Sequence, residues 1–517
     1  MIVLQFVLQQ NRNLSIRPLA MNVLLSTTLL IFAIFPLEAL CAPITNEDIK
    51  WLNRITYGID TQTIENFQDL GRQAFLAQQL DRGMNEKLPP QVQKIISDLQ
   101  IEQVTPEMLS EHFQEQNQII KKLPKNERIS AHNEQKAYAK EIYEEAVQRH
   151  LLRALYSQAQ IKEQLTWFWL NHFNIFQGKG PIRWLISDYE ESAIRPHVLG
   201  KFRDLLMATL QHPAMLIYLD NSHNAANKIN ENYARELMEL HTLGIEGGYS
   251  QLDIEALTKV LTGAGVNFGS GQPKLGNKLM PYYRRNGSFE FNPKRHDFSQ
   301  KQFLGEKIAG EGFVEIEKIV DILARHPSTA KFISYKLAVY FVSDTPPSEL
   351  IEKMAKTFKK TDGDISATLM TLFESKEFAA SLGSKIRDPM HYILASLRFA
   401  FDKQTITYVD PINKWLKDLG EPLYGHLTPD GYGMTEKDWI SPAQLTKHFE
   451  TAKHIVNNND ISSNHSISLK ETRLSSTLLF QKIEPILSNQ TKLALQKAVT
   501  PSEWNTLLLS APEFLYR

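Results

Sequence analysis

Apolar side chains recur at helical spacing along most of the chain, and this pattern predicts a mainly α, multi-helical protein. Ile49, Leu52 and Ile55 describe a short first helix, which Tyr57 and Gly58 end. Further helices are expected over residues 61–80, 127–156, 158–176, 251–261, 330–341 and 365–378, with two more between 187 and 219. The segment 127–156 is rich in Glu, Gln and Lys, so we expect a long helix with a mostly solvated surface.

One segment has the pattern of strands instead of helices. Residues 264–312 are rich in Gly, Tyr and Phe, and Asn286-Gly287 stands between two short runs of strand-forming residues. Because Asn-Gly favours the tight turn of a two-stranded hairpin, we expect a small β-hairpin insertion around residues 282–304.

Residues 230–244 combine strong helix formers with many ionisable groups and end at Gly244. This composition predicts one amphipathic helix that the glycine terminates. At helical spacing, Tyr233, Leu237 and Leu240 form a face that can be buried. We treat this stretch as the centre around which the rest of the chain is organised.

The other face of the central helix is polar and carries four candidate functional residues, Asn232, Arg235, Glu236 and Glu239. Two interpretations stay open. The face is either solvated, with Glu231 and Arg235 forming an i,i+4 ion pair, or it is a ligand or metal site built on a rigid helix. The spacing does not separate the two.

Three further groups of residues have chemistry that suits a site. His172 lies on an aromatic helical stripe, where a histidine is either a hydrogen-bonded core residue or a functional group. His296 and Asp297 follow the predicted hairpin and suit either proton transfer or capping. The loop 422–439 is rich in turn residues and carries four candidate binding residues, Tyr424, Asp430, Tyr432 and Trp439.

The first 41 residues have the layout of a signal peptide. Arg12 and Arg17 precede an apolar run over residues 23–35, and small residues follow around Cys41 and Ala42. We therefore expect an exported protein, periplasmic or extracellular, that contacts a membrane only through this segment if it is not cleaved. Met21 is an alternative start, although the segment would then lose its positive charge.

Composition restricts the classes of function. The 517 residues carry a formal charge of −1 and are 42% hydrophobic, so the chain has a large core and no basic field that would indicate nucleic-acid binding. Its single cysteine, Cys41, lies at the expected cleavage site, so the mature chain would have no disulfide, thiolate metal ligand or cysteine nucleophile. The sequence also lacks the zinc-protease, nucleophile-elbow and P-loop signatures, and it indicates no particular metal or cofactor.

Several segments together resemble the bacterial proteins known as domain of unknown function 1800. The matching segments are residues 52–58, 168–173, 202–206, 230–244, 261–263, Phe291 with His296-Asp297, and 512–514. The loop 422–439 is similar to that of one branch of the family. Ala264 departs from the tryptophan that many members have after Thr-Gly, which puts in doubt any role assigned to that corner.

The resemblance implies a mostly helical, exported protein whose gene often lies beside one for a sulfatase-like protein, but it implies no reaction. We expect the central helix, His172, the His296-Asp297 turn and the 422–439 loop to form one polar cleft. In an enzyme, Glu236 or Glu239 would be the base or a metal ligand, His172 and His296 acids or ligands, and Arg235 an anion clamp. An envelope hydrolase or transferase would suit the compartment, with loop aromatics stacking on polysaccharide.

The alternative is a non-catalytic binding or assembly factor for a secreted or envelope partner. Arg235 would then lock Glu231 or Glu239, and His172 would hold a backbone carbonyl. A site requires an open cleft with unpaired acids, whereas a structural network should be closed and fully paired.

The length of the chain predicts a protein with two or three lobes. We divide the chain into a signal peptide (1–41), an N-terminal helical layer with the long polar helix (42–150), a central helical core with the hairpin (151–312) and a C-terminal helical region (313–517).

Overall fold

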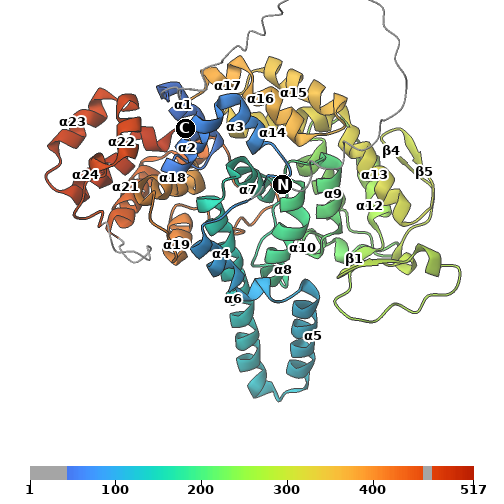
Figure 1. Cartoon of the computed structure of the whole chain (residues 1–517). Coiled ribbons are helices and arrows are strands. Elements are labelled where there is room, and N and C mark those ends of the chain that lie inside the picture. Colours follow the sequence, from blue (N-terminus) through green and yellow to red (C-terminus); the bar gives the residue numbers. More distant parts are fainter. Residues whose placement is uncertain (1–43, 85, 458–467) are drawn as a thin grey trace, which may run out of the picture. The chain divides into compact units, whose positions relative to one another are not determined.

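Helices make up most of the structure, a computed structural model that describes residues 44–84, 86–457 and 468–517 (Figure 1). Within these ranges, strands occur only in two small antiparallel sheets. The prediction of a mainly α, multi-helical fold is therefore confirmed. The expected signal peptide lies outside the described residues, and no helix inside them is long and apolar enough to cross a membrane.

The first helices confirm the predicted start and correct the second element. Helix α1 (Asn46–Ile55) begins with a capping box in which Thr45 and Asp48 satisfy each other's backbone amides. The expected helix 61–80 is two helices, α2 (Thr61–Leu70) and α3 (Arg72–Gln79). Gly71 separates them because its φ of 75° lies in the left-handed region that breaks a helix.

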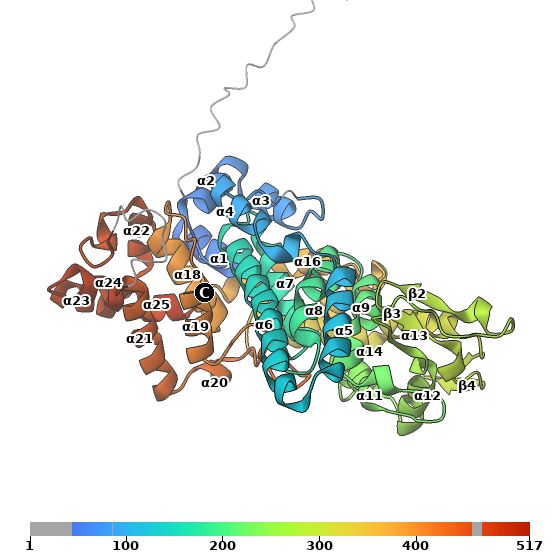
Figure 2. The same cartoon turned by 90° about the horizontal axis from the view of Figure 1, so that it is seen from below.

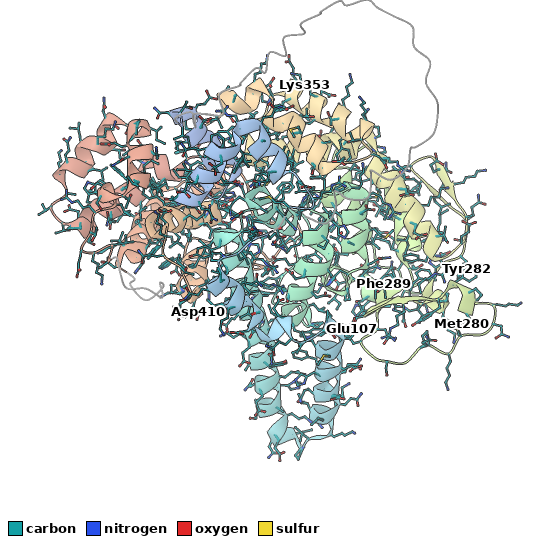
Figure 3. The ribbon with its side chains drawn as sticks, in the orientation of Figure 1. Glu107, Met280, Tyr282, Phe289, Lys353 and Asp410 are labelled. Carbon is teal, nitrogen blue, oxygen red and sulfur yellow. The ribbon has the colours of Figure 1, made fainter. Side chains whose placement is uncertain are left out.

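A helical hairpin follows and projects below the other helices in Figure 1; Figure 2, seen from below, shows its two helices side by side in front of the rest. It consists of α5 (Pro106–Lys122) and the first half of α6 (Lys125–Tyr156), preceded by α4 (Pro90–Ser97). The first half of α6 is polar and solvated as predicted, whereas all the buried residues of the helix lie from Ala139 onward. Near its base, Ser110 lies 3.2 Å from Ser288 of the β structure, and Figure 3 shows Glu107 and Phe289 close by.

The centre of the fold is α7 (Gln160–His172), all of whose residues except Lys162 are buried. Trp169 is fully buried, and its indole Nε1 donates to the Val198 carbonyl at 3.1 Å. Around α7 lie α8 (Ile182–Asp188), a π-helical turn η2 (Tyr189–Ile194), α9 (Phe202–Gln211) and α10 (Pro213–Tyr218). Residues 187–219 therefore contain more elements than the two helices expected.

The predicted hairpin is confirmed. β2 (Arg284–Asn286) pairs with β3 (Phe289–Phe291), and Gly287 in the turn has a φ of 52°. The structure adds β1 (Ala264–Val266), which pairs with the other edge of β3, and a second hairpin of β4 (Lys301–Phe303) and β5 (Glu306–Ile308).

The remaining helices surround this centre. α12 (Gln251–Leu261) has the predicted bounds, whereas the predicted helix 365–378 is interrupted and becomes α16 (Ile365–Phe373) and α17 (Lys376–Ala380). The others are α13 (Phe313–Arg325), α14 (Pro327–Phe341), α15 (Ser348–Lys360), α18 (Pro389–Phe401), α19 (Asp410–Asp418), α20 (Glu436–Trp439), α21 (Pro442–Asn457), α22 (Leu478–Ile483), α23 (Asn489–Lys497), α24 (Pro501–Leu509) and α25 (Pro512–Leu515).

One hydrophobic cluster runs through the described chain from Ile49 to Leu515, and the described residues form one compact unit. The predicted domain boundaries at residues 150 and 312 therefore fall inside the stretch of chain that builds this continuous core. They stay predictions.

Candidate functional site

The central segment is helical, but it changes helix type in the middle. Residues Asn232–Glu236 form the short helix α11, and Leu237–Thr242 form a π-helical turn, η5. The Thr242 hydroxyl donates to the Leu237 carbonyl at 2.6 Å, across five residues. π turns are uncommon and often occur at functional sites, which makes this segment a candidate on its own geometry.

The π turn also changes which side chains are buried. Tyr233 and Leu237 are buried as predicted, but Leu240 is half-buried and lines a cleft instead. Met238 and His241 are buried in its place. The correction follows from geometry, because an extra residue per turn rotates all later side chains around the helix axis.

The segment ends at Gly244 for two reasons that both require glycine. Its φ is 80°, and a Cβ at this position would lie 3.0 Å from the Phe332 ring. The close approach brings the end of the central segment against α14. Between these two elements lies an open cleft.

The cleft has a volume of about 660 Å³, within the range of small-molecule sites. It draws its walls from five parts of the fold: the central segment with the turn after it, α14, α15, the end of α7 and the 422–439 loop. The side chains that matter most for its chemistry are His172, Glu239, Asp430, Lys336, Phe332 and Tyr335. Three predicted site residues, His172, Glu239 and Asp430, therefore meet here.

Glu236 adjoins this cleft. Burial and the negative charges of Glu239 and Asp430 raise the pKa of Glu236 above its ordinary value, against the attraction of Arg235. Its carboxylate has no hydrogen-bond or ion-pair partner within 44–84, 86–457 and 468–517. An unpaired acid with a raised pKa is suited to donate a proton near neutral pH.

Arg235 is engaged by its own segment. Its guanidinium lies 3.3 Å from both Glu231 and Glu239, and it donates to the Gln251 side chain at 3.0 Å. The i,i+4 pair predicted from the sequence is therefore present, and Arg235 is not a free anion clamp. Asn232 is exposed at the start of α11, where its backbone amide donates to Asn230 at 3.0 Å.

His172 is a buried histidine whose two ring nitrogens differ. Nε2 lies 3.1 Å from the His241 carbonyl, which only accepts, so Nε2 carries the proton. Nδ1 has no partner among the described residues. Burial holds the pKa of His172 well below its usual range, and electrostatic interactions with Lys336 and with His241 lower it further. His172 thus fixes the central segment through a backbone carbonyl and presents an unprotonated Nδ1.

His241 is fully buried beside His172, with ring centroids 6.0 Å apart. Neither of its ring nitrogens has a partner in the described structure. Burial and the charge of Lys336 lower the pKa of His241 to about 3. Both histidines are therefore neutral at neutral pH.

Lys336 is the cleft residue that the sequence did not single out. It lies in the middle of α14 and is half-buried among apolar neighbours. Burial lowers the pKa of its ammonium group, and the attraction of Asp430 only partly offsets this effect. The available signal was one lysine in the mostly apolar run of residues 332–341, a pattern that usually reflects a side chain reaching solvent.

The 422–439 loop is fixed to the end of α7 by two asparagines. The Asn171 side chain accepts from the Tyr432 amide at 2.7 Å and donates to its carbonyl at 3.0 Å. The Asn174 side chain donates to the His426 carbonyl at 3.1 Å and the Thr428 carbonyl at 2.8 Å. These four hydrogen bonds hold the part of the loop that carries Asp430.

The loop aromatics point into the protein and do not line the cleft. Tyr424 donates to the buried carboxylate of Glu190, and Tyr432 donates to the Pro422 carbonyl at 2.8 Å. The Trp439 indole donates to the Gly433 carbonyl at 2.9 Å. All three are buried, so none offers a free ring face to a sugar in this structure, and the binding role expected of them stays a prediction.

His296 and Asp297 also lie outside the cleft. His296 is buried, with Nδ1 2.8 Å from the Thr262 carbonyl and Nε2 2.9 Å from Glu315. Lys301 lies 2.7 Å from the other oxygen of Glu315. Asp297 accepts from the Ser299 amide at 2.8 Å, which is a capping role. The structure therefore does not bring this turn together with Glu236.

A second cluster of charges surrounds the π turn η2. Glu190 and Glu163 are buried against Arg195 and His150, with distances from 2.7 to 3.5 Å. Within the described residues, the two carboxylates and Arg195 are paired with one another or with His150, and Nε2 of His150 is left without a partner. We interpret the cluster as a structural network, since its carboxylates are already paired.

No group of three or more histidine, cysteine, aspartate or glutamate side chains is placed to hold a metal ion in the part of the chain that is described. The cleft instead combines a raised-pKa acid, carboxylates, a lowered-pKa lysine and an apolar wall. Such a set can transfer protons and hold an uncharged or partly polar ligand.

Comparison with known proteins agrees with the resemblance seen in the sequence. No curated protein and no solved structure matches the chain. Residues 50–516 match the family model described as "Protein of unknown function (DUF1800)". That match begins within α1 and runs through α25, so this chain belongs to the DUF1800 family.

Proposed function

We propose that the protein is an exported hydrolase or transferase that uses acid–base catalysis in the cleft between the central segment and α14. Glu236 acts as the general acid, and Asp430 or Glu239 acts as its carboxylate partner. The observation that carries the proposal is the raised pKa of Glu236 beside two further carboxylates at an open cleft. Neighbouring acids whose pKa values are separated by their surroundings are typical of proton-transfer sites.

The substrate class that we propose is an envelope polysaccharide or peptidoglycan-like polymer. Tyr335, with 42% of its surface exposed, and Phe332 line the cleft and supply aromatic surface in place of the buried loop aromatics. Carboxylates beside aromatic faces suit a ligand with many hydroxyl groups. The predicted export supports a substrate in the envelope.

The test is release of soluble product from purified envelope polymers by the mature chain and two variants. Glu236→Gln removes the acid while it keeps the shape, and we expect it to lower kcat by about 100-fold or more. Glu374→Gln is the matched control, because Glu374 is exposed at the end of α16, away from the cleft. Equal activity of Glu236→Gln and wild type would refute the assignment.

The second candidate is a non-catalytic assembly or binding factor. It is favoured by two contacts expected of a structural network: the ion pairs of Arg235 with Glu231 and Glu239, and the hydrogen bond of His172 to the His241 carbonyl. A sulfatase-like protein encoded nearby is the proposed partner. Co-purification of the two recombinant proteins as a stoichiometric complex, unchanged by Glu236→Gln, would favour this candidate over the enzyme.

A further inference from the structure

The amine of Lys336 differs from the other lysine of the cleft. Lys331, one and a half turns earlier on α14, pairs with Glu352 at 2.6 Å. Lys336 has neither a hydrogen bond nor an ion pair to any residue within 44–84, 86–457 and 468–517. A half-buried, unpaired lysine side chain on a cleft wall is uncommon, because ammonium groups are normally paired or hydrated.

The surroundings of Lys336 favour its neutral form. Phe332, Leu243 and Ile351 give the cleft an apolar wall. Burial lowers the pKa of Lys336, and the one charge that opposes this effect is that of Asp430. His172 and His241, on the same side, are neutral and accept no proton from it at neutral pH. A lysine held in this way is a nucleophile.

We propose that Lys336 forms a covalent imine with a ligand that carries an aldehyde or ketone group. This inference goes beyond the acid–base function proposed above, because it assigns the cleft a covalent step and a different reacting group. It rests on the placement of one unpaired amine, an apolar wall and a carboxylate, Asp430, in the same cleft.

The step balances with groups that are present. The lone pair of the Lys336 nitrogen adds to the carbonyl carbon as the C=O π bond breaks, and one nitrogen proton passes to the oxygen, which gives a carbinolamine. The C–O bond then breaks, the hydroxyl leaves with the second nitrogen proton as one water molecule, and the nitrogen lone pair completes the C=N bond. Asp430 lines the same cleft as Lys336 and is the carboxylate that we propose relays these protons.

The charges of the cleft also restrict the carbonyl compound. Its acids are Glu239, Glu246 and Asp430, whereas its lysines are Lys331, which is already paired, and Lys336, which reacts in the neutral form. A carboxylate or phosphate on the ligand would be repelled. We therefore expect a neutral, hydroxylated aldehyde or ketone to react in preference to an acidic one.

The experiment is reductive trapping on the full mature chain. The protein is mixed with glyceraldehyde and cyanoborohydride at pH 7, and the adducts are located by peptide mapping. Lys353 is the reference, because its side chain is 55% exposed on α15 and points away from the fold in Figure 3. We expect severalfold more adduct at Lys336 than at Lys353, because burial lowers the pKa of Lys336 and so enlarges its neutral, reactive fraction.

Two variants and a second probe complete the test. Lys336→Arg keeps a long basic side chain but forms no imine, so the adduct at position 336 should disappear, while Lys353→Arg should leave labelling of Lys336 unchanged. Glyoxylate, an acidic aldehyde, should label Lys336 less than glyceraldehyde does. Equal labelling of Lys336 and Lys353 in the wild-type chain would overturn the proposal, whether or not the variants fold. Trapping requires no turnover, so its result is independent of the polymer assay.

Discussion

Burial changes the pKa values of Glu236 and Lys336 in opposite directions, and both changes have the same cause. Taking either group out of water penalises its charged form, so the pKa of the acid rises and that of the amine falls. Both groups therefore approach the pH at which proton transfer is efficient. Structural ion pairs, such as Arg195 with Glu163, show the other outcome, in which charges are retained because they are paired.

The raised pKa of Glu236 predicts how stability depends on pH. An acid whose pKa is higher in the folded state than in the unfolded state contributes most at low pH, and this contribution is lost as pH rises through the window above the ordinary value of 4.5. Glutamine has no charged form, so the Glu236→Gln variant does not lose this stability as pH rises. We expect the variant to be more stable than wild type at pH 7 and equal to it below about pH 4.5, as measured by urea denaturation. A less stable variant at pH 7 would indicate that Glu236 is a structural residue.

His296 provides a contrasting prediction at the same scale. Although burial raises the pKa of Glu315, hydrogen bonds from His296 and Lys301 hold it below its ordinary value. His296→Ala removes one of these donors, and we expect a loss of about 2–3 kcal/mol in unfolding free energy at pH 7. The loss should shrink as pH falls through the lowered pKa of Glu315. Asp297→Asn, a change at the adjacent capping residue, is the control and should cost less than about 1 kcal/mol. Equal losses in the two variants would contradict the pairing.

At the scale of elements, the sequence predicted correctly those helix bounds that depend on contacts between residues close together in the chain. The bounds of α12 were predictable because Ser250 and Asp253 form a capping box within the sequence itself. The π turn η5 was not predictable, since contacts from elsewhere, including His172 to the His241 carbonyl, accompany it. A pattern at 3.6 residues per turn therefore placed Leu240 in the core by mistake.

The same limit explains which residues of the candidate site could be predicted from the sequence and which could not. Sequence reasoning selected His172, Glu239 and Asp430 because their types suit chemistry, and the fold brings them to one cleft. It also selected Tyr432, whose burial depends on Asn171 of a distant helix. Burial of a loop residue is a tertiary property, so composition alone did not separate the loop's aromatics from its acid.

The attachment of the 422–439 loop to α7 predicts the effect of a small change at Gly431. Its φ is 73°, and a Cβ there would lie 2.2 Å from the Asn171 carbonyl oxygen. We expect Gly431→Ala to cost about 1–3 kcal/mol and to displace the loop with Asp430. Limited proteolysis should then cut within residues 422–439, while Gly276→Ala, which has open space around its Cβ, should leave the cleavage pattern unchanged. An uncut loop in Gly431→Ala would contradict this attachment.

At the scale of the whole molecule, Arg54 joins segments that are far apart in the sequence. The fully buried guanidinium donates to the carbonyls of Phe341 at 2.6 Å and Val342 at 3.1 Å, at the end of α14. It also donates to Ser381 Oγ at 2.9 Å, at the end of α17, and to the Arg517 carbonyl. Carbonyls at helix C-termini carry partial negative charge, so they stabilise a buried cation without a carboxylate.

This arrangement predicts that Arg54 contributes far more to the free energy of unfolding than a surface arginine does. Arg54→Met leaves several buried carbonyls without a donor, and we expect a loss of about 3–5 kcal/mol in unfolding free energy. Arg325→Met is the matched control. Arg325 pairs with Asp362 at 2.8 Å, but both side chains are about 60% exposed, so its removal should cost less than about 1 kcal/mol. Urea denaturation followed by tryptophan fluorescence measures both. Because Arg54 joins the N-terminal helix α1 to the ends of α14 and α17 and to Arg517, its loss should lower one cooperative transition. A separate early transition of the N-terminal helices would contradict that role.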